Sequence, residues 1–284
     1  MAVVRAHEMT PDNASATGRA ATLTEFYSQV IGAGRTVGLD ALVAAEYQPY
    51  APEFAGVPTL LPGLTALRDR LSRTGAIAHR VARIISDGDL AFAHVKYSGN
   101  APVAGVDVFQ FNDAGKIAAH WNVRQPLPLG GTQGEDRFAS DVTPDANLGL
   151  DPAWLKSRIK SMLVEMWGKG NASLVPDFYD QSYVQHNAEM PGGYYRILEV
   201  VQTEIPKYIA RTGEPYPINL HCIVAQGDLV GIHISIFMAG INRQDGVRAN
   251  NVDIFRVDRH GRMVEHWDVL HIDGIALPSL ATLF

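Results

Sequence analysis

The sequence predicts an α+β fold that occurs twice along the chain, with helices packed on one face of an antiparallel sheet in each copy. Two observations support this prediction. Short segments of the first half recur in the second half in the same order. In each half, segments of helical periodicity precede segments of strand-like alternation that are separated by Gly-containing turns. A length of 284 residues suits two domains of ordinary size.

Three pairs of matching segments carry the internal repeat. Ser86–His94 matches Ala225–His233, Val106–Phe109 matches Val252–Phe255, and His120–Val123 matches His266–Val269. The first pair is offset by 139 residues and the other two by 146, so the second copy carries an insertion, which we place near Asn242–Gly246. Identities kept in order indicate duplication. We therefore expect domains at residues 19–128 and 152–284, joined by a Gly- and Pro-rich linker at 129–151.

Helical patterns come first in each copy. They cover Ala20–Ile31, Thr36–Tyr47 and Leu60–Arg73 in the first copy, then Ala153–Trp167, Ala172–Gln181 and Tyr194–Arg211 in the second. Strand patterns follow at Ile77–Ile85, Leu90–Tyr97, Val103–Phe111 and Lys116–Gln125, then at Ile218–Ala225, Leu229–Met238, Val247–Val257 and Arg262–Ile272. Turns such as Asp87-Gly88-Asp89 join these strands into hairpins, because Gly tolerates a positive φ. Each copy is thus expected to form a four-stranded meander.

Composition and charge exclude several classes of protein. The net charge is -6, which argues against binding to nucleic acid or to an anionic membrane surface. The single cysteine, Cys222, excludes an internal disulfide and a thiolate-rich metal site. No leader-like segment or membrane-spanning apolar run occurs in this sequence, so we expect a cytoplasmic protein.

The last hairpin of the second copy gathers the candidate catalytic residues. A turn centred on Arg259-His260 pairs Asp253 with His266 across the strands, and the same layout pairs Asp107 with His120 in the first copy. Side chains alternate along a strand, so Asp253, His266 and Asp268 share one face. This face either is the solvated side of an antiparallel sheet or lines a pocket. In a pocket, a buried carboxylate serves as a base for a proton next to a carbonyl, and a neighbouring imidazole or amide stabilises the enolate.

The same residues carry a family resemblance. The run Asp253-Ile254-Phe255-Arg256, followed by Gly261 to Val269 with its His-Trp-Asp step, resembles the closing hairpin of the SnoaL-like polyketide cyclases, which belong to the nuclear transport factor 2-like superfamily. The upstream Tyr183-Val184-Gln185-His186-Asn187 and Pro191-Gly192 resemble another signature of this family. The resemblance implies a cone in each copy, a cystatin-like roll whose strongly curved sheet wraps around the N-terminal helices and encloses an apolar cavity.

The resemblance also implies an activity without a cofactor. Asp268 would be the base, with Asp253–His266 as its supporting dyad, acting on a small apolar carbonyl compound by aldol-type cyclisation, isomerisation or dehydration. Substrate contacts are expected from residues of the second copy, namely Tyr183, His186, Asn187, Asn251, His233 and Trp167. Relatives of this shape include isomerases, dehydratases, epoxide hydrolases and plain binders, so a non-catalytic binder of a hydrophobic metabolite or a scaffold protein is the alternative.

The first copy departs from the pattern at the proposed base. Asn122 stands where the second copy has Asp268, and Tyr50-Ala51 stands where it has His186-Asn187. An amide accepts no proton at neutral pH, so we expect the second domain to be the active one. The apolar strand faces with Trp121 and Trp267 are expected to pack together as an intramolecular pseudo-dimer, and the chain could form a further homo-oligomer.

Two other interpretations carry less weight. The second half holds six of the ten histidines, and a metal site with Asp253 is conceivable, but no His pair has the i, i+4 spacing of a metal-binding helix, so no metal is expected. His94 and His233 sit at equivalent strand positions with small or apolar neighbours, which favours histidines bonded within the core over polar groups of a pocket.

Overall fold

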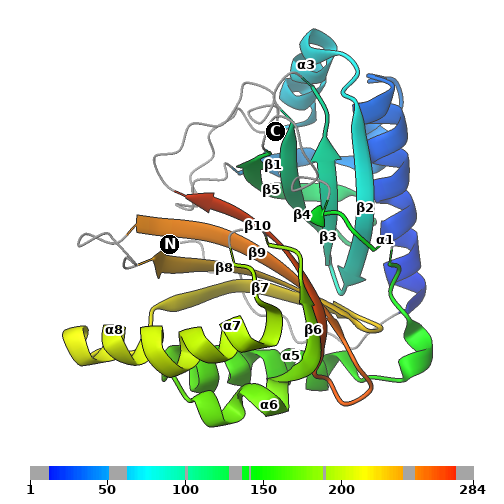
Figure 1. Ribbon diagram of the computed structural model, residues 1–284. Helices are drawn as coiled ribbons and strands as arrows, with labels where there is room; N and C mark the ends of the chain where they lie inside the picture. The colour runs from blue at the N-terminus through cyan, green and yellow to red at the C-terminus, as the bar shows by residue number, and fades with distance from the viewer. Residues whose placement is uncertain are drawn as a thin grey trace. The chain divides into compact units, whose positions relative to one another are not determined.

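The computed structural model describes residues 13–50, 63–99, 102–127, 136–140, 142–187, 190–238 and 247–272. The chain divides into two compact units. The first takes in the described residues from 13 to 127, and the second takes in 136–140 and the described residues from 144 to 272. Each unit holds one five-stranded sheet and its own helices, which confirms the α+β class and the two tandem domains (Figure 1).

The first unit begins with helices and ends with a meander. Its helical elements are α1 (Asn13–Glu25), the π-helical η1 (Phe26–Gly32), α2 (Leu39–Leu42) and α3 (Leu64–Thr74). Its strands are β1 (Val43–Pro49), β2 (His79–Asp87), β3 (Leu90–Tyr97), β4 (Val103–Phe111) and β5 (Ile117–Pro126). The sheet order is β1-β5-β4-β3-β2, with β1 parallel to β5 and the other neighbours antiparallel.

The second unit repeats this order. Its helical elements are η2 (Ala146–Leu148), α5 (Pro152–Ser161), η3 (Met162–Gly168), η4 (Ala172–Leu174), α6 (Val175–Phe178), α7 (Gly193–Glu199), η5 (Val200–Glu204) and α8 (Ile205–Thr212). Its strands are β6 (Tyr179–Gln185), β7 (Ile218–Gln226), β8 (Leu229–Met238), β9 (Val247–Val257) and β10 (Met263–Ile272). The sheet order is β6-β10-β9-β8-β7, and β6 runs parallel to β10.

The meander strands lie where the sequence predicts them, but each sheet has a fifth strand that the prediction missed. The segments expected as helices over Thr36–Tyr47 and Ala172–Gln181 begin as short helices and then continue as β1 and β6. Alanines in Val43-Ala44-Ala45 favour a helix locally, but the edge of β5 offers this segment backbone partners. The pairing with a distant strand decides the conformation. As a result, β6 carries Tyr183 and Gln185 to the candidate site.

The register of the closing hairpin differs by two residues from the predicted one. Asp268 lies opposite Asp253, and His266 lies opposite Phe255. The cause is twofold: the turn is centred on His260, and the register shifts again between Met263 and Glu265 at a β-bulge. The first unit has the same shift, with Asp107 opposite Asn122. A shift of two residues keeps every side chain on its predicted face.

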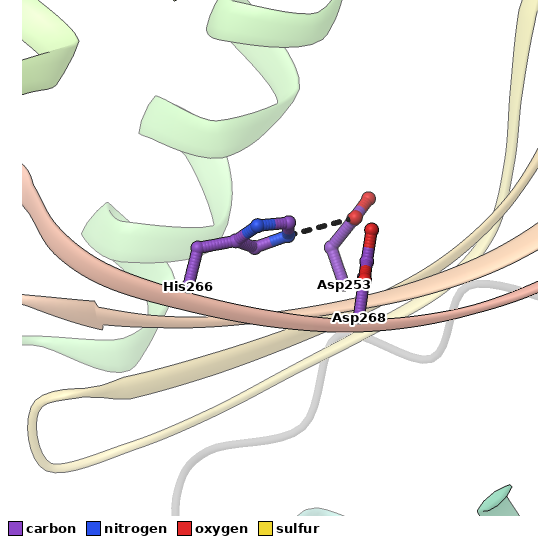
Figure 2. Close-up of side chains that lie close together, drawn as sticks. All are labelled: Asp253, His266 and Asp268. Carbon is purple, nitrogen blue, oxygen red and sulfur yellow. Dashed lines mark hydrogen bonds and ion pairs between the residues drawn. The ribbon is translucent and has the colours of Figure 1, made fainter. Parts of the chain in front are cut away.

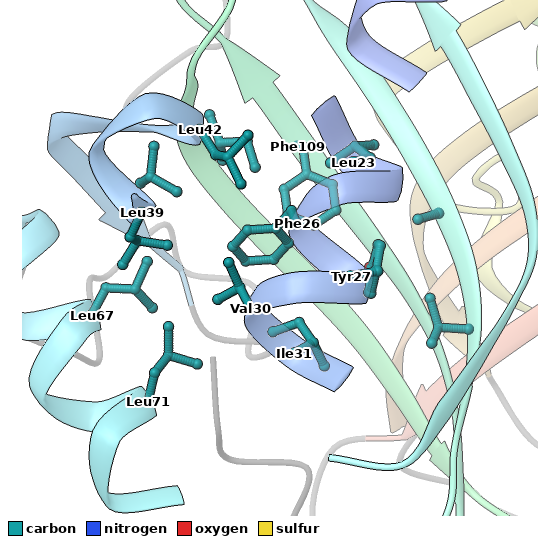
Figure 3. Packing of buried hydrophobic residues seen from close by; sticks show 14 of the residues in the cluster. Leu23, Phe26, Tyr27, Val30, Ile31, Leu39, Leu42, Leu67, Leu71 and Phe109 are labelled. Carbon is teal, nitrogen blue, oxygen red and sulfur yellow. The ribbon is translucent and has the colours of Figure 1, made fainter. Parts of the chain in front are cut away.

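Each unit buries its hydrophobic core between its helices and one face of its sheet. In the first unit, Phe26 of η1 packs edge-on against Phe109 of β4 with ring centroids 5.9 Å apart (Figure 3). In the second unit, Phe255 and Val257 of β9 share a buried cluster with Met162 and Met166 of η3. The faces that carry Phe109 and Phe255 are therefore the helix-covered faces of the two sheets.

Some predictions fall outside the described residues. These include the insertion near Asn242–Gly246, residue Ala51, and the linker apart from 136–140 and 142–151. Within the described part of the chain, no helix has the length and the apolar character needed to cross a membrane.

Candidate active site

Asp253, His266 and Asp268 come together on the helix-covered face of the second sheet. One ligand atom from each of the three lies within 4.8 Å of the other two, and all three residues are buried. Figure 2 shows their side chains rising from the two neighbouring strands toward the same side. The ring of His266 stacks on Phe255, its cross-strand partner, with centroids 4.7 Å apart. The polar cluster is therefore bordered by the hydrophobic core and is not the solvated side of the sheet.

Both ring nitrogens of His266 have acceptors. Nε2 lies 2.9 Å from Oδ1 of Asp253, and Nδ1 lies 2.7 Å from Oε1 of Gln185. The backbone N–H of Asn187 also donates to Oε1 of Gln185, which fixes that atom as the amide oxygen. Nδ1 of His266 therefore carries the proton that it donates to Gln185, and Nε2 lies against the carboxyl group of Asp253.

Asp268 is a buried carboxylate with two donors. Asn187 Nδ2 lies 2.5 Å from Oδ2, and Arg137 Nη1 lies 3.1 Å from Oδ1. Burial raises the pKa of Asp268 above its ordinary value, and the nearby charge of Asp253 raises it too, against the opposing effects of His266, Arg137 and Asn187. A carboxylate of raised pKa in a buried site is a competent general base.

Arg137 belongs to the segment that the sequence predicts as linker, and sequence reasoning missed it. The short stretch 136–140 belongs to the second unit, and three further contacts attach it there. His186 Nδ1 lies 3.2 Å from Oδ1 of Asp136, Trp267 Nε1 donates to the Ala139 carbonyl at 2.9 Å, and Ser140 donates to Glu265. No periodicity marks a segment so short, so only the folded chain shows that its guanidinium reaches the site.

Replacing Arg137 with Met should raise the pKa of Asp268 further, because the guanidinium favours the ionised carboxylate. The pKa is measured by ¹³C NMR titration of the carboxyl carbons, with the Asp268 signal assigned from Asp268→Asn. Arg256→Met is the matched control, since Arg256 pairs with Glu265 on the opposite face of β10. An unchanged Asp268 titration in Arg137→Met, or an equal rise in the control, would contradict this electrostatic role.

The structure brings three more of the predicted residues to the cluster. Tyr183 of β6 stacks near His266, with ring centroids 6.3 Å apart. Asn187, just beyond β6, reaches Asp268, and Asn251 of β9 donates to Asp253 Oδ1 at 2.7 Å. Trp167 lies in η3 and packs, partly buried, against the helix-side core. Gln185 and Phe255 complete the surroundings of His266, and sequence reasoning missed both because β6 and the register were not predicted.

Two predicted residues lie on the opposite face of the sheet. His186 stacks on Trp267 with centroids 5.5 Å apart, and its Nε2 lies 2.8 Å from Oε1 of Glu265. His233 pairs with Val252 and lies 2.9 Å from Oδ1 of Asn250. The positions of both histidines follow from alternation along the strands. Trp267 lies between His266 and Asp268, and Val252 lies next to Asp253, so both point away from the site residues. The rings of both histidines point away from the cluster, although the backbone N–H of His186 donates to the carbonyl of His266 at 3.1 Å.

His233 should make the second unit acid-sensitive. Burial, with a smaller effect of the nearby His221, lowers the pKa of His233 to about 4. The unfolded chain protonates this histidine near pH 6.5, whereas the folded chain keeps it neutral down to about pH 4. The free energy of unfolding is therefore unaffected by this group above pH 6.5 and falls as the pH drops from 6.5 toward 4. The loss amounts to about 3 kcal/mol. The free energy of unfolding is measured at several pH values by urea titration followed by fluorescence. Its decrease below pH 6.5 should be smaller in His233→Gln than in the wild-type protein, and unchanged in His260→Gln in the exposed turn. The same decrease in His233→Gln and wild-type protein would contradict this prediction.

The first unit holds a different set of partners at the equivalent carboxylate. Asp107 accepts hydrogen bonds from the hydroxyls of Tyr27 and Tyr97, and Arg124 Nη2 lies 2.8 Å from its Oδ1. Burial by itself would raise the pKa of Asp107, but Arg124 and the hydrogen bonds hold it well below its ordinary value. The first unit therefore holds Asp107 in a buried ion pair with Arg124, and an amide, Asn122, lies opposite it where the second unit has Asp268.

The cluster in the second unit is also a donor set that could hold a divalent cation. Two carboxylates and one imidazole are ligands that zinc, manganese and iron accept. However, both ring nitrogens of His266 already lie within hydrogen-bond distance of side-chain oxygens, so a metal ion would have to displace one of these contacts. The adjacent guanidinium of Arg137 also opposes a cation. The residues present therefore fit proton transfer better than metal binding.

A family model matches part of the chain. Residues 23–120 match the model of the SnoaL-like domain. No curated protein matches the chain. An NTF-2 like protein of unknown function from Burkholderia xenovorans LB400 is 20% identical over 42% of this chain and 92% of its own, with a TM-score of 0.35. A steroid delta-isomerase from Pseudomonas aeruginosa is 20% identical over 52% of this chain and 95% of its own, with a TM-score of 0.32. An LEH-like epoxide hydrolase from M. tuberculosis is 14% identical over 39% of this chain and 84% of its own, with a TM-score of 0.34.

Proposed function

We propose that the second unit is a cofactor-independent acid–base enzyme, starting from the match of residues 23–120 to the SnoaL-like domain and from the same strand order in the second sheet. Its substrate would be a small, largely apolar carbonyl compound. The single observation that carries the proposal is the environment of Asp268, a buried carboxylate of raised pKa that pairs with Arg137 and lies beside Asp253 and His266.

The proposed step is removal of a proton from the carbon next to the carbonyl. The C–H electron pair moves into the carbonyl group and forms an enolate, while the proton goes to Oδ2 or Oδ1 of Asp268. As the carboxylate becomes neutral, negative charge develops on the substrate oxygen. Arg137 is the nearby cationic group, and a charge fixed in a buried site stabilises such an oxygen without reorganising. Asn187 holds the carboxylate of Asp268 in place through Oδ2.

The fate of the enolate decides the reaction type. Attack on a second carbonyl of the same molecule is an aldol cyclisation, reprotonation at another carbon is an isomerisation, and loss of a β-hydroxyl is a dehydration. All three begin with the same proton transfer, so one assay tests the shared step.

The test is exchange of α-protons in D₂O. The intact protein is incubated with a panel of cyclic and aromatic ketones, and deuterium at the α-carbon is followed by NMR against a protein-free control. Exchange that the protein accelerates supports the proposal. Binding of a ketone without accelerated exchange would instead favour a non-catalytic binder.

A further inference from the structure

The side-chain oxygen Oδ1 of Asn251 is a buried acceptor to which no described residue of the second unit donates a hydrogen bond. The residue lies in β9, two positions before Asp253 and on the same face, and only 7% of it is exposed. Its Nδ2 donates to Oδ1 of Asp253 at 2.7 Å. Its Oδ1 is fully buried, and among the described residues no donor reaches it. Buried side-chain oxygens in folded proteins nearly always receive a hydrogen bond.

The orientation of this amide is fixed. Turning it around would place the carbonyl oxygen against the carboxylate of Asp253, and two acceptors repel each other. Asp253 is itself held by His266, which lies 2.9 Å from the same oxygen. The acceptor of Asn251 therefore cannot satisfy itself by rotation, and no described residue supplies the donor that it needs.

The first unit lacks this acceptor because it uses the position differently. Gly105 stands two residues before Asp107, as Asn251 stands before Asp253, and it pairs across the strands with Arg124. A Cβ at Gly105 would lie 3.1 Å from Nη1 of Arg124 and 3.1 Å from the ring of Tyr97. The glycine makes room for the unit's own arginine. In the second unit, Asn251 pairs with Leu270, which donates nothing to the face that Asn251 shares with Asp253.

We propose that Asn251 is a specificity-determining residue whose Oδ1 accepts a hydrogen bond from a hydroxyl group of the substrate. The proposal rests on the proposed function and narrows its substrate class to hydroxylated carbonyl compounds. The hydroxyl would lie near the reacting carbon, because Asn251 adjoins Asp253, which is paired directly with Asp268.

The test compares matched ketones that differ by one hydroxyl, such as 1-tetralone, its ring-hydroxylated forms, and equivalent pairs of cyclic ketones. Binding to the intact protein is measured by calorimetry. We expect the hydroxylated member of a pair to bind about 10–100-fold more tightly, the worth of one buried hydrogen bond. Asn251→Leu should abolish this ratio. Asn250→Ser, at the adjacent position on the opposite face, is the matched control and should keep it.

A second measurement needs no variant. In wild-type protein, the side-chain ¹³Cγ resonance of Asn251 should shift on addition of a hydroxylated ketone and not on addition of its deoxy partner. The inference would be overturned by equal affinity for both members of a pair, or by no binding of any pair. It would also be overturned by an unchanged affinity ratio in Asn251→Leu, or by a bound structure in which only water donates to Oδ1 of Asn251. Preferential binding of the hydroxylated ketone without α-proton exchange would refute the proposed function and support this inference. Exchange without that preference would support the proposed function and refute this inference.

Discussion

Asp268→Asn should reduce α-proton exchange by about 10²–10⁴-fold, the usual contribution of a positioned general base. The amide has nearly the same shape and keeps a hydrogen bond available to Arg137, but it cannot accept the substrate proton. The loss should appear in kcat, because the group acts on the transferred proton. Exchange rates at several pH values, measured by NMR on the ketone that wild-type protein turns over, provide the readout.

The first unit supplies a matched control for this substitution. Asn122 occupies the position of Asp268, opposite Asp107, and Asn122→Asp places a carboxylate there. We expect no gain in exchange from Asn122→Asp, alone or combined with Asp268→Asn, because Arg124 already holds Asp107 and the two tyrosines in a closed network. Retention of wild-type exchange in Asp268→Asn would remove Asp268 as the base.

Arg124→Met should destabilise the first unit by about 3–5 kcal/mol, because it leaves a carboxylate buried without its cationic partner. Arg124 and Asp107 are each about 1% exposed, and the guanidinium also lies over the ring of Tyr97 at 4.1 Å. Amide hydrogen exchange of β3, β4 and β5 reports the stability of this unit separately from that of the second.

The double variant Arg124→Met with Asp107→Asn tests the cause. Neutralising the carboxylate while keeping acceptors for the two tyrosines should restore most of the lost stability, which a double-mutant cycle measures as coupling. Lys169→Met is the control for an ion pair, since Lys169 and Glu165 form an exposed pair on neighbouring helical turns and should change stability by less than about 1 kcal/mol. A loss that small for Arg124→Met would mean that the buried pair carries little of the unit's stability.

Most of the meander could be predicted because its signals are local. Alternation and Gly-containing turns placed β3, β4, β8 and β9 at the bounds that the structure has. The same alternation placed Asp253, His266 and Asp268 on one face, and a register error of two residues could not change that face. The repeat then located the equivalent Asp107 and Asn122 without further information.

The remaining parts of the site depend on contacts between residues distant in the sequence. β6 forms a strand because β10 offers it an edge, and without β6 neither Gln185 nor the approach of Asn187 could be foreseen. The bulge between Met263 and Glu265 set the register, and it has no signature in the residue types. His186 and His233 were expected near the substrate but lie across the sheet. His233 alternates with Ile232, which pairs with Asp253, and His186 lies just beyond the end of the unpredicted strand β6.

The sequence by itself determined the duplication, the α+β class and the three residues of the polar face, since identities in order and a period of two are properties of neighbouring residues. Only the tertiary structure decided which face the helices cover, that Arg137 of the expected linker reaches Asp268, and that the acceptor of Asn251 meets no donor among the described residues. These features depend on burial and on long-range pairing, and both arise only when distant segments pack together.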